Sequence, residues 1–158
     1  MATQYAEALR KSGQAEKASY ILESFANQDE APVDTIVEYA SIQLENGDYE
    51  DAETFARKAL AQDDKSSEAH HLLGIALDAQ AKHVEAEASF RTALDMWEGD
   101  PVPIMNNLAL NLASQERIQD AVDILKKAKS IAPNRIEVER NLRIISTLNE
   151  DPKAFNNN

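Results

Sequence analysis

The sequence of 158 residues contains no cysteine and only four glycines. The absence of cysteine excludes disulfides, thiolate nucleophiles and cysteine-based zinc sites. So few glycines leave little room for a glycine-rich loop that holds phosphate. No apolar run approaches the ~18 residues of a membrane-spanning helix, and the N-terminal segment MATQYAEALRKSGQ lacks the apolar core of a signal segment. We therefore expect no membrane span in this chain.

Basic residues are also scarce, with 16 Lys and Arg against 28 Asp and Glu, which gives a net charge of -12. The excess lies in the middle of the chain: residues 23–100 hold 19 acidic and 5 basic residues, whereas residues 1–22 hold 2 and 3. Such a charge disfavours nucleic acid, because the phosphates would be repelled. The apolar fraction of 43% still suffices for a packed core, so we expect a folded domain. The negative charge favours neutral or basic segments as partners.

Small residues repeat at a nearly constant spacing along the chain. Alanines recur at intervals of 34, 34 and 35 residues, at Ala18, Ala52, Ala86 and Ala121. Each follows an apolar stretch of helical period, so every unit is expected to form two amphipathic helices joined by a tight turn. Gly13 and Gly47 are predicted to end first helices in the left-handed conformation. Ala81 and Glu116 occupy the corresponding positions in the later units.

A helix–turn–helix repeat of 34 residues resembles the tetratricopeptide repeat family. The third unit carries the pattern best, with Leu73, Gly74 and Leu77 in its first helix and Ala86 and Phe90 in its second. The resemblance implies an all-α, right-handed solenoid of about four repeats closed by a C-terminal capping helix. As one domain over residues 1–149, its repeats would cover residues 1–31, 34–65, 67–98 and 102–133, its capping helix residues 135–149, and a disordered tail residues 150–158.

Motifs of enzyme active sites are absent: the sequence contains no GxxxxGK[ST], GxGxxG, HExxH or GxSxG. The adjacent His70 and His71 would point about 100° apart on a helix and cannot easily share a metal. Pairs of acidic residues are expected by chance at this composition, on solvated helix faces. We therefore predict a protein that is not an enzyme and has neither a cofactor nor a metal site.

The family resemblance implies that the first helices line a concave groove. Ten residues are then expected to face a partner peptide or helix: Glu38, Ser41, Glu45, His71, Ile75, Asp78, Asn106, Asn107, Leu110 and Asn141. The family often uses an inward asparagine at the position of Asn107, whose amide both donates to and accepts from a peptide backbone. The lysine and arginine clamp of the chaperone-tail binders is missing, so that subfamily is not expected. The loop around Trp97 is an alternative contact surface.

The C-terminal third has a closer resemblance, to the TadD group of Flp (tight-adherence) pilus assembly proteins. The shared pattern is Asn106-Asn107-Leu108, then Ala132-Pro133, then Arg140-Asn141-Leu142. The resemblance implies a role in bacterial pilus assembly and secretion, at the periplasmic face of the outer membrane. Two alternatives are a cytoplasmic tetratricopeptide adaptor or co-chaperone and a regulatory segment of a larger protein. Weak self-association is also predicted, between the acidic middle of one chain and Lys126, Lys127, Lys129, Arg140 and Arg143 of another.

Overall fold

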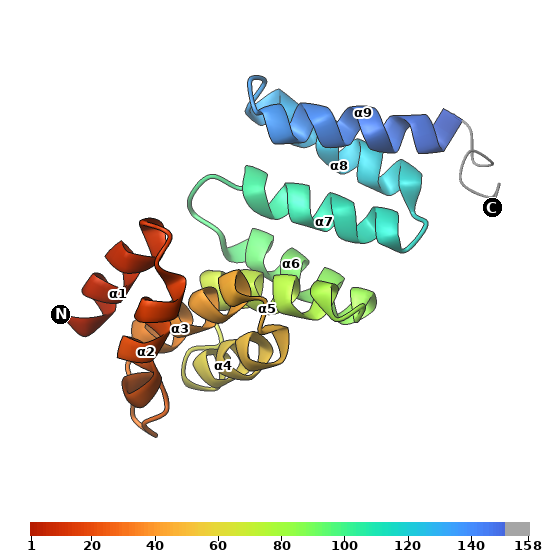
Figure 1. Cartoon of the computed structure of the whole chain (residues 1–158). Helices are drawn as coiled ribbons and strands as arrows, with labels where there is room; N and C mark the ends of the chain where they lie inside the picture. The colour runs from red at the N-terminus through yellow and green to blue at the C-terminus, as the bar shows by residue number, and fades with distance from the viewer. Residues whose placement is uncertain (151–158) are drawn as a thin grey trace, which may run out of the picture. The chain divides into compact units, whose positions relative to one another are not determined.

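The computed structural model describes residues 1–150, and within that range α-helix is the only regular secondary structure (Figure 1). The helices are α1 (Ala2–Lys11), α2 (Ala15–Ala26), α3 (Val33–Asn46), α4 (Tyr49–Gln62), α5 (Ser67–Ala79), α6 (His83–Met96), α7 (Val102–Ser114), α8 (Ile118–Ile131) and α9 (Ile136–Glu150). This order confirms the prediction of four helix–turn–helix repeats followed by one more helix. Of the predicted disordered tail, residues 151–158 lie outside the described residues. Among the described helices, none is both long enough and apolar enough to cross a membrane.

The turn between the two helices of each repeat has the same backbone conformation in all four repeats. Gly13 and Gly47 have φ of 79° and 82°, and Ala81 and Glu116 follow with 59° and 62°. In each turn the next N–H bonds back to the carbonyl five residues earlier, as Asp48 N does to Gln43 O at 2.8 Å. The repeat thus imposes a left-handed residue at this position, including where the side chain is not glycine.

The helices form two compact units, described here separately: residues 1–96, with α1 to α6, and the part that begins at Trp97, with α7 to α9. In the first unit each helix pair packs together, and α2 and α4 pack on the first helix of the next pair. The first helices α1, α3 and α5 also contact one another in sequence order. In the second unit α8 and α9 pack together, and α7 contacts both. The extent of the predicted single domain, residues 1–149, stays a prediction.

Small residues lie where the helices approach most closely. Ala18, Ala52, Ala86 and Ala121 are all fully buried, as the repeat pattern predicted. Gly74 in α5 lies very close to α6, because a Cβ built there would lie 2.6 Å from Cδ1 of Phe90 in α6. In the second unit, α9 buries Val138 and Ile145 and so covers an apolar face, as a capping helix must.

Candidate functional site

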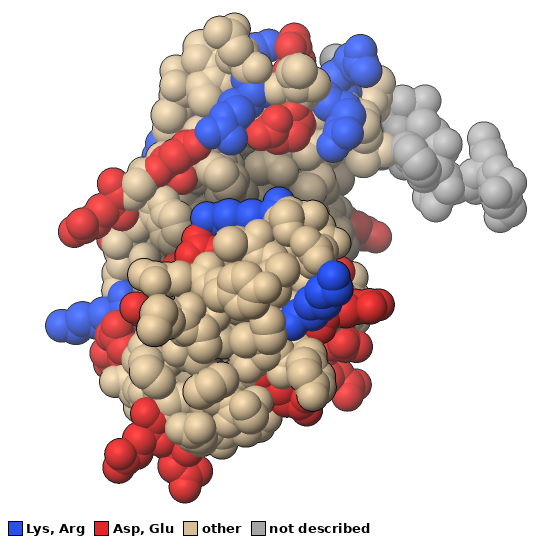
Figure 2. Space-filling view, turned by 60° about the vertical axis from the view of Figure 1, so that its left-hand side comes forward, with Lys and Arg blue, Asp and Glu red and all other residues tan. Residues whose placement is uncertain are grey.

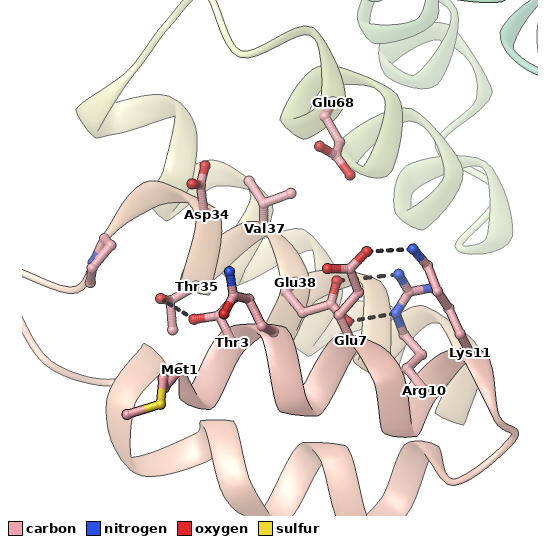
Figure 3. A pocket seen from close by; sticks show the side chains of 12 residues that line it. Met1, Thr3, Glu7, Arg10, Lys11, Asp34, Thr35, Val37, Glu38 and Glu68 are labelled. Atoms are coloured by element: carbon pink, nitrogen blue, oxygen red, sulfur yellow. Dashed lines mark hydrogen bonds and ion pairs between the residues drawn. The ribbon is translucent and has the colours of Figure 1, made fainter.

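The first helices of the first unit line a pocket of about 580 Å³ (Figure 3). Its walls come from the N-terminal helix α1, from the start of α3 and from Glu68 of α5. The lining residues are Met1, Thr3, Gln4, Glu7, Arg10, Lys11, Pro32, Asp34, Thr35, Val37, Glu38 and Glu68. Three consecutive first helices therefore share one open surface, which we call the concave face of the first unit.

Arg10 neutralises two of the predicted groove residues. Its Nε lies 2.7 Å from Oε1 of Glu38, and its Nη1 lies 2.8 Å from Oε1 of Glu45. The hydrogen bond to Glu38 is the main reason why the pKa of Arg10 is raised. Glu38 is only 9% exposed and Glu45 is exposed. Both carboxylates therefore help to hold α1 against α3, and a partner could reach only Glu45 readily.

Two other carboxylates of the pocket remain without an ion pair among the described residues, Asp34 of α3 and Glu68 of α5. In Figure 3 both lie above the paired group formed by Glu7, Lys11, Arg10 and Glu38. The pKa of Glu68 is raised, first because its carboxyl is partly removed from water and second because Glu38 is near. A cation at the mouth of the pocket would stabilise the ionised form of this carboxylate.

The other predicted residues of the first unit lie along α3 and α5, two helices in contact. Ser41 is 8% exposed, and Ile75 is partly buried. Burial lowers the pKa of His71 to about 4, so its ring is neutral at neutral pH. Asp78 Oδ1 lies 2.7 Å from Nδ1 of His83, at the turn into α6. Of these residues His71 and Ile75 offer a mainly apolar strip, and Asp78 is partly engaged within the chain.

The predicted residues of the second unit lie on α7 and α9, which contact each other. Asn141 donates a hydrogen bond from Nδ2 to Oδ1 of Asn106 at 2.9 Å, and Asn141 is only 7% exposed. Leu110 is 39% exposed, and Asn107 is partly buried. Two of the three asparagines predicted to face a partner, Asn106 and Asn141, are therefore used to join α9 to α7.

Arg10 is the main residue that sequence reasoning missed. The first repeat is the least similar copy, so its first helix received no groove residues. Aligning the repeats on Gly13, Gly47 and Ala81 places Arg10 at the position of Asp78, a predicted groove residue. That register would have identified Arg10 as a residue of the concave face.

Metal binding finds no support in the described residues, where no three His, Asp or Glu side chains are grouped closely enough to hold an ion. The remaining polar contacts of the pocket join its own walls: Thr3 Oγ1 and Thr35 Oγ1 lie 2.9 Å apart and link α1 to α3. The face therefore offers charge, hydrogen-bond groups and shape for binding.

Two family models match the chain, both described as tetratricopeptide repeat, over residues 38–101 and 104–132. Together they cover more than half of the chain, and the helix–turn–helix pairs agree with them. The chain is therefore a tetratricopeptide repeat protein. Repeats of this family typically serve as non-enzymatic modules for contacts between proteins, and this is the class of function that the family supports here. No curated protein matches the chain.

Solved structures agree on the fold. A crystal structure of MamA has a TM-score of 0.79 at 19% identity, over 92% of this chain and 84% of that one. MamA from Desulfovibrio magneticus RS-1 reaches a TM-score of 0.81 at 17% identity, over 96% and 85%. YrrB, described as a TPR protein with an unusual peptide-binding site, has a TM-score of 0.73 at 15% identity, over 94% and 76%. At such identities the likeness extends to the fold alone, and the resemblance to the TadD group stays a prediction.

Proposed function

We propose that this protein is a scaffold that binds a neutral or basic segment of a partner protein on the faces formed by its first helices. The observation that carries the proposal is the pocket of the first unit, where Asp34 and Glu68 have no ion-pair partner among the described residues. A lysine or arginine of the partner would supply the missing cation. The apolar strip at His71 and Ile75 would then contact the rest of the segment.

The charge of the chain favours the same choice of partner. Residues 23–100 hold 19 acidic and 5 basic residues, so a basic segment is attracted from a distance and an acidic one is repelled. The peptide-binding site ascribed to YrrB supports the proposal, because that protein shares the fold of this chain. The proposal therefore rests on local geometry, on charge and on a fold that binds peptides elsewhere.

The test compares labelled peptides of one sequence in which the charged positions are all lysine or all glutamate, by fluorescence anisotropy. We expect the lysine peptide to bind more tightly, and the double substitution Asp34→Asn/Glu68→Gln to weaken it by about tenfold, because two attractive charges are lost. Asp95→Asn/Glu98→Gln removes the same charge from two exposed residues that do not line the pocket and is the matched control. If both variants lost the same affinity for the lysine peptide, net charge alone would explain the effect. That result would contradict a binding site at the pocket.

In the second unit, Asn107 is the proposed contact to the peptide backbone, since it lies partly exposed on α7. Replacing it with alanine is expected to weaken a bound peptide by about 1 kcal/mol, the net value of a typical hydrogen bond. Asn134→Ala, at an exposed asparagine outside the helices, is the control. If calorimetry showed that Asn107→Ala binds the peptide with unchanged affinity, Asn107 would not be part of the proposed binding face.

The finer role in Flp pilus assembly rests only on the resemblance of residues 101–148 to the TadD group. If it holds, we expect the protein at the periplasmic side of the outer membrane, captured together with pilus secretion components. Fractionation of cells that make Flp pili, with the natural full-length gene product, tests both points. Recovery in the cytoplasm with unrelated partners would favour the adaptor or co-chaperone alternative, and a gene product with a further domain would favour the regulatory segment.

A further inference from the structure

The first helix pair carries an apolar surface that no described helix covers. Tyr20 and Tyr5 are 83% and 60% exposed, and Leu9 and Ile21 are only partly buried beside them. Tyr5 and Leu9 lie on α1, whereas Tyr20 and Ile21 lie on α2. We call these four residues the N-terminal face. After Met1, Tyr20 is the most exposed large apolar side chain of the described residues, and here it has a second exposed tyrosine beside it.

The register of the repeats explains why this face is apolar. Tyr5 corresponds to Tyr39 and Leu73 in the next two repeats, and each of those is only 5% exposed. Leu9 corresponds to Gln43 and Leu77, which are 5% and 1% exposed.

Those later positions are buried because the second helix of the preceding pair packs on them, as α2 packs on α3 and α4 on α5. The hydrogen bond from Ser19 Oγ to Gln43 Oε1, at 3.1 Å, belongs to one such contact. The N-terminal face is thus a stacking surface on which no described helix packs.

The shape of the face suits a second face of the same kind. The Tyr20 ring stands between two hollows, of about 410 Å³ and about 660 Å³. The first hollow is lined by Tyr5, Leu9, Glu16, Lys17, Tyr20 and Ile21, and the second by Tyr20, Ile21, Glu23, Ser24 and Asn27. A projecting ring between two hollows is self-complementary, because a two-fold axis can place each ring in a hollow of the other copy.

Charge favours a second copy here over other places in the first unit. Arg10 and Lys11 line the peptide pocket, so the charged residues at the N-terminal face are Lys17, Glu16 and Glu23, whereas residues 23–100 hold 19 acidic and 5 basic residues and repel another copy. Lys17 lies at one hollow together with Glu16, and Glu23 lies at the other, so charges of both signs can pair across a two-fold axis. Figure 2 turns the side of the molecule that carries α1 and α2 toward the viewer, and a broad uncharged area there is bordered by acidic and basic side chains.

We infer that this protein forms a two-fold symmetric dimer in which the N-terminal faces of two copies pack together, with Tyr20 of each copy seated in a hollow of the other. Tyrosine suits such a place, because its ring buries much apolar area while its hydroxyl reaches the edge of the contact. The hollows of the N-terminal face and the pocket of the proposed peptide face have no lining residue in common. The inference is thus independent of the peptide-binding proposal.

Sedimentation equilibrium over a wide range of protein concentration tests the dimer. We expect a monomer–dimer equilibrium for the unchanged chain, and a dimer dissociation constant at least about tenfold higher for Tyr20→Arg, because each copy loses its central ring and gains a buried charge. Val84→Arg is the matched control, since Val84 is 74% exposed on α6 and lies outside the N-terminal face. Circular dichroism and a melting curve check that both variants keep the fold.

Three outcomes overturn the inference: a monomer up to about 1 mM, a dimer that Tyr20→Arg leaves unchanged, and a dimer that Val84→Arg disrupts as much. A fourth is a dimer that dissociates in high salt, since that behaviour fits the contact between basic α8–α9 residues and the acidic middle of another chain. An interface of tyrosine and aliphatic side chains changes little with salt. Peptide binding measured on Tyr20→Arg is expected to be normal, so failure of the dimer and failure of the peptide site are distinguishable.

Discussion

Among single residues, Gly74 has the clearest structural requirement for its identity. A Cβ there would lie 2.6 Å from two ring carbons of Phe90, which is only 1% exposed and has no room to move. We expect Gly74→Ala to lower the free energy of unfolding by about 1–2 kcal/mol, although alanine is the better helix former by about 1 kcal/mol. Urea unfolding followed by circular dichroism measures the change.

A second substitution separates the clash from other effects. The fourth repeat has Ala109 and Leu125 where the third has Gly74 and Phe90, and both of those residues are buried. The double variant Gly74→Ala/Phe90→Leu recreates that combination, so its loss of stability should be smaller than the sum of the two single losses. Additive losses, or a Gly74→Ala variant as stable as the unchanged chain, would contradict a steric conflict with Phe90.

His71 predicts a pH dependence of stability. Burial lowers its pKa from 6.5 to about 4, so below pH 6.5 the unfolded chain takes up a proton that the folded chain does not. Stability is therefore lost as pH falls from 6.5 toward 4. We expect His71→Gln to reduce the loss between about pH 7 and about pH 5 by on the order of 1 kcal/mol, a value that allows for the partial exposure of the ring.

Denaturant unfolding at the two pH values is the measurement. The hydrogen bond from Lys82 is the main reason why the pKa of Glu53 is lowered to about 2. The ionised Glu53 therefore stabilises the fold at every pH above 4.5, the ordinary pKa of glutamate. Its contribution is lost only below pH 4.5, so it does not affect the comparison between pH 7 and pH 5. Equal slopes for His71→Gln and the unchanged chain between pH 7 and pH 5 would show that the ring of His71 is protonated as readily in the fold as in solution.

The turns between paired helices require a left-handed backbone residue, whichever side chain the sequence has there. Gly47 has φ of 82° and no atom within 4 Å of an added Cβ, so Gly47→Ala changes only the backbone preference. Ala81 holds φ of 59° at the same place in the next repeat. We expect Gly47→Ala to destabilise the chain and Ala81→Gly to stabilise it, each by about 1 kcal/mol.

The opposite signs make each substitution the control for the other, and thermal unfolding by calorimetry compares them. A loss of stability in both would indicate that alanine at position 81 makes contacts worth more than the backbone strain. The same turn also marks a limit of prediction: Gly13 and Gly47 mark it by residue type, whereas at Glu116 only the repeat spacing does.

For the whole molecule, the net charge of -12 implies a dependence of stability on salt. The acidic residues of the middle segment repel one another, and salt shortens the range of that repulsion to about 10 Å at 0.1 M. We expect the melting temperature to rise between about 20 mM and about 500 mM NaCl, and to rise less in Asp95→Lys/Glu98→Lys, which makes the chain less acidic. A melting temperature that falls with salt would mean that ion pairs such as Arg10–Glu38 outweigh the repulsion.

The concave face could be predicted in part. The family resemblance implied a groove on the first helices with Glu38, His71 and Asp78 among its residues, and their contact with a partner stays a prediction. The sequence could not show which partners those side chains have within the fold. Glu38 is paired with Arg10, from a helix 28 positions away in sequence, and Asn106 bonds to Asn141 on α9. Such pairings depend on distances between helices that no local pattern encodes.

By itself the sequence determined the helices, their turns and the family, because apolar period, small residues and turn residues act within one 34-residue unit. Only the tertiary structure decided which equivalent residues are covered. Tyr5 and Tyr39 hold the same place in their repeats, yet Tyr5 is 60% exposed and Tyr39 is 5% exposed. The difference arises because α2 packs on α3, whereas no described helix packs on that side of α1. Whether a residue is buried depends on which helices pack against it, and the arrangement of all the helices decides that.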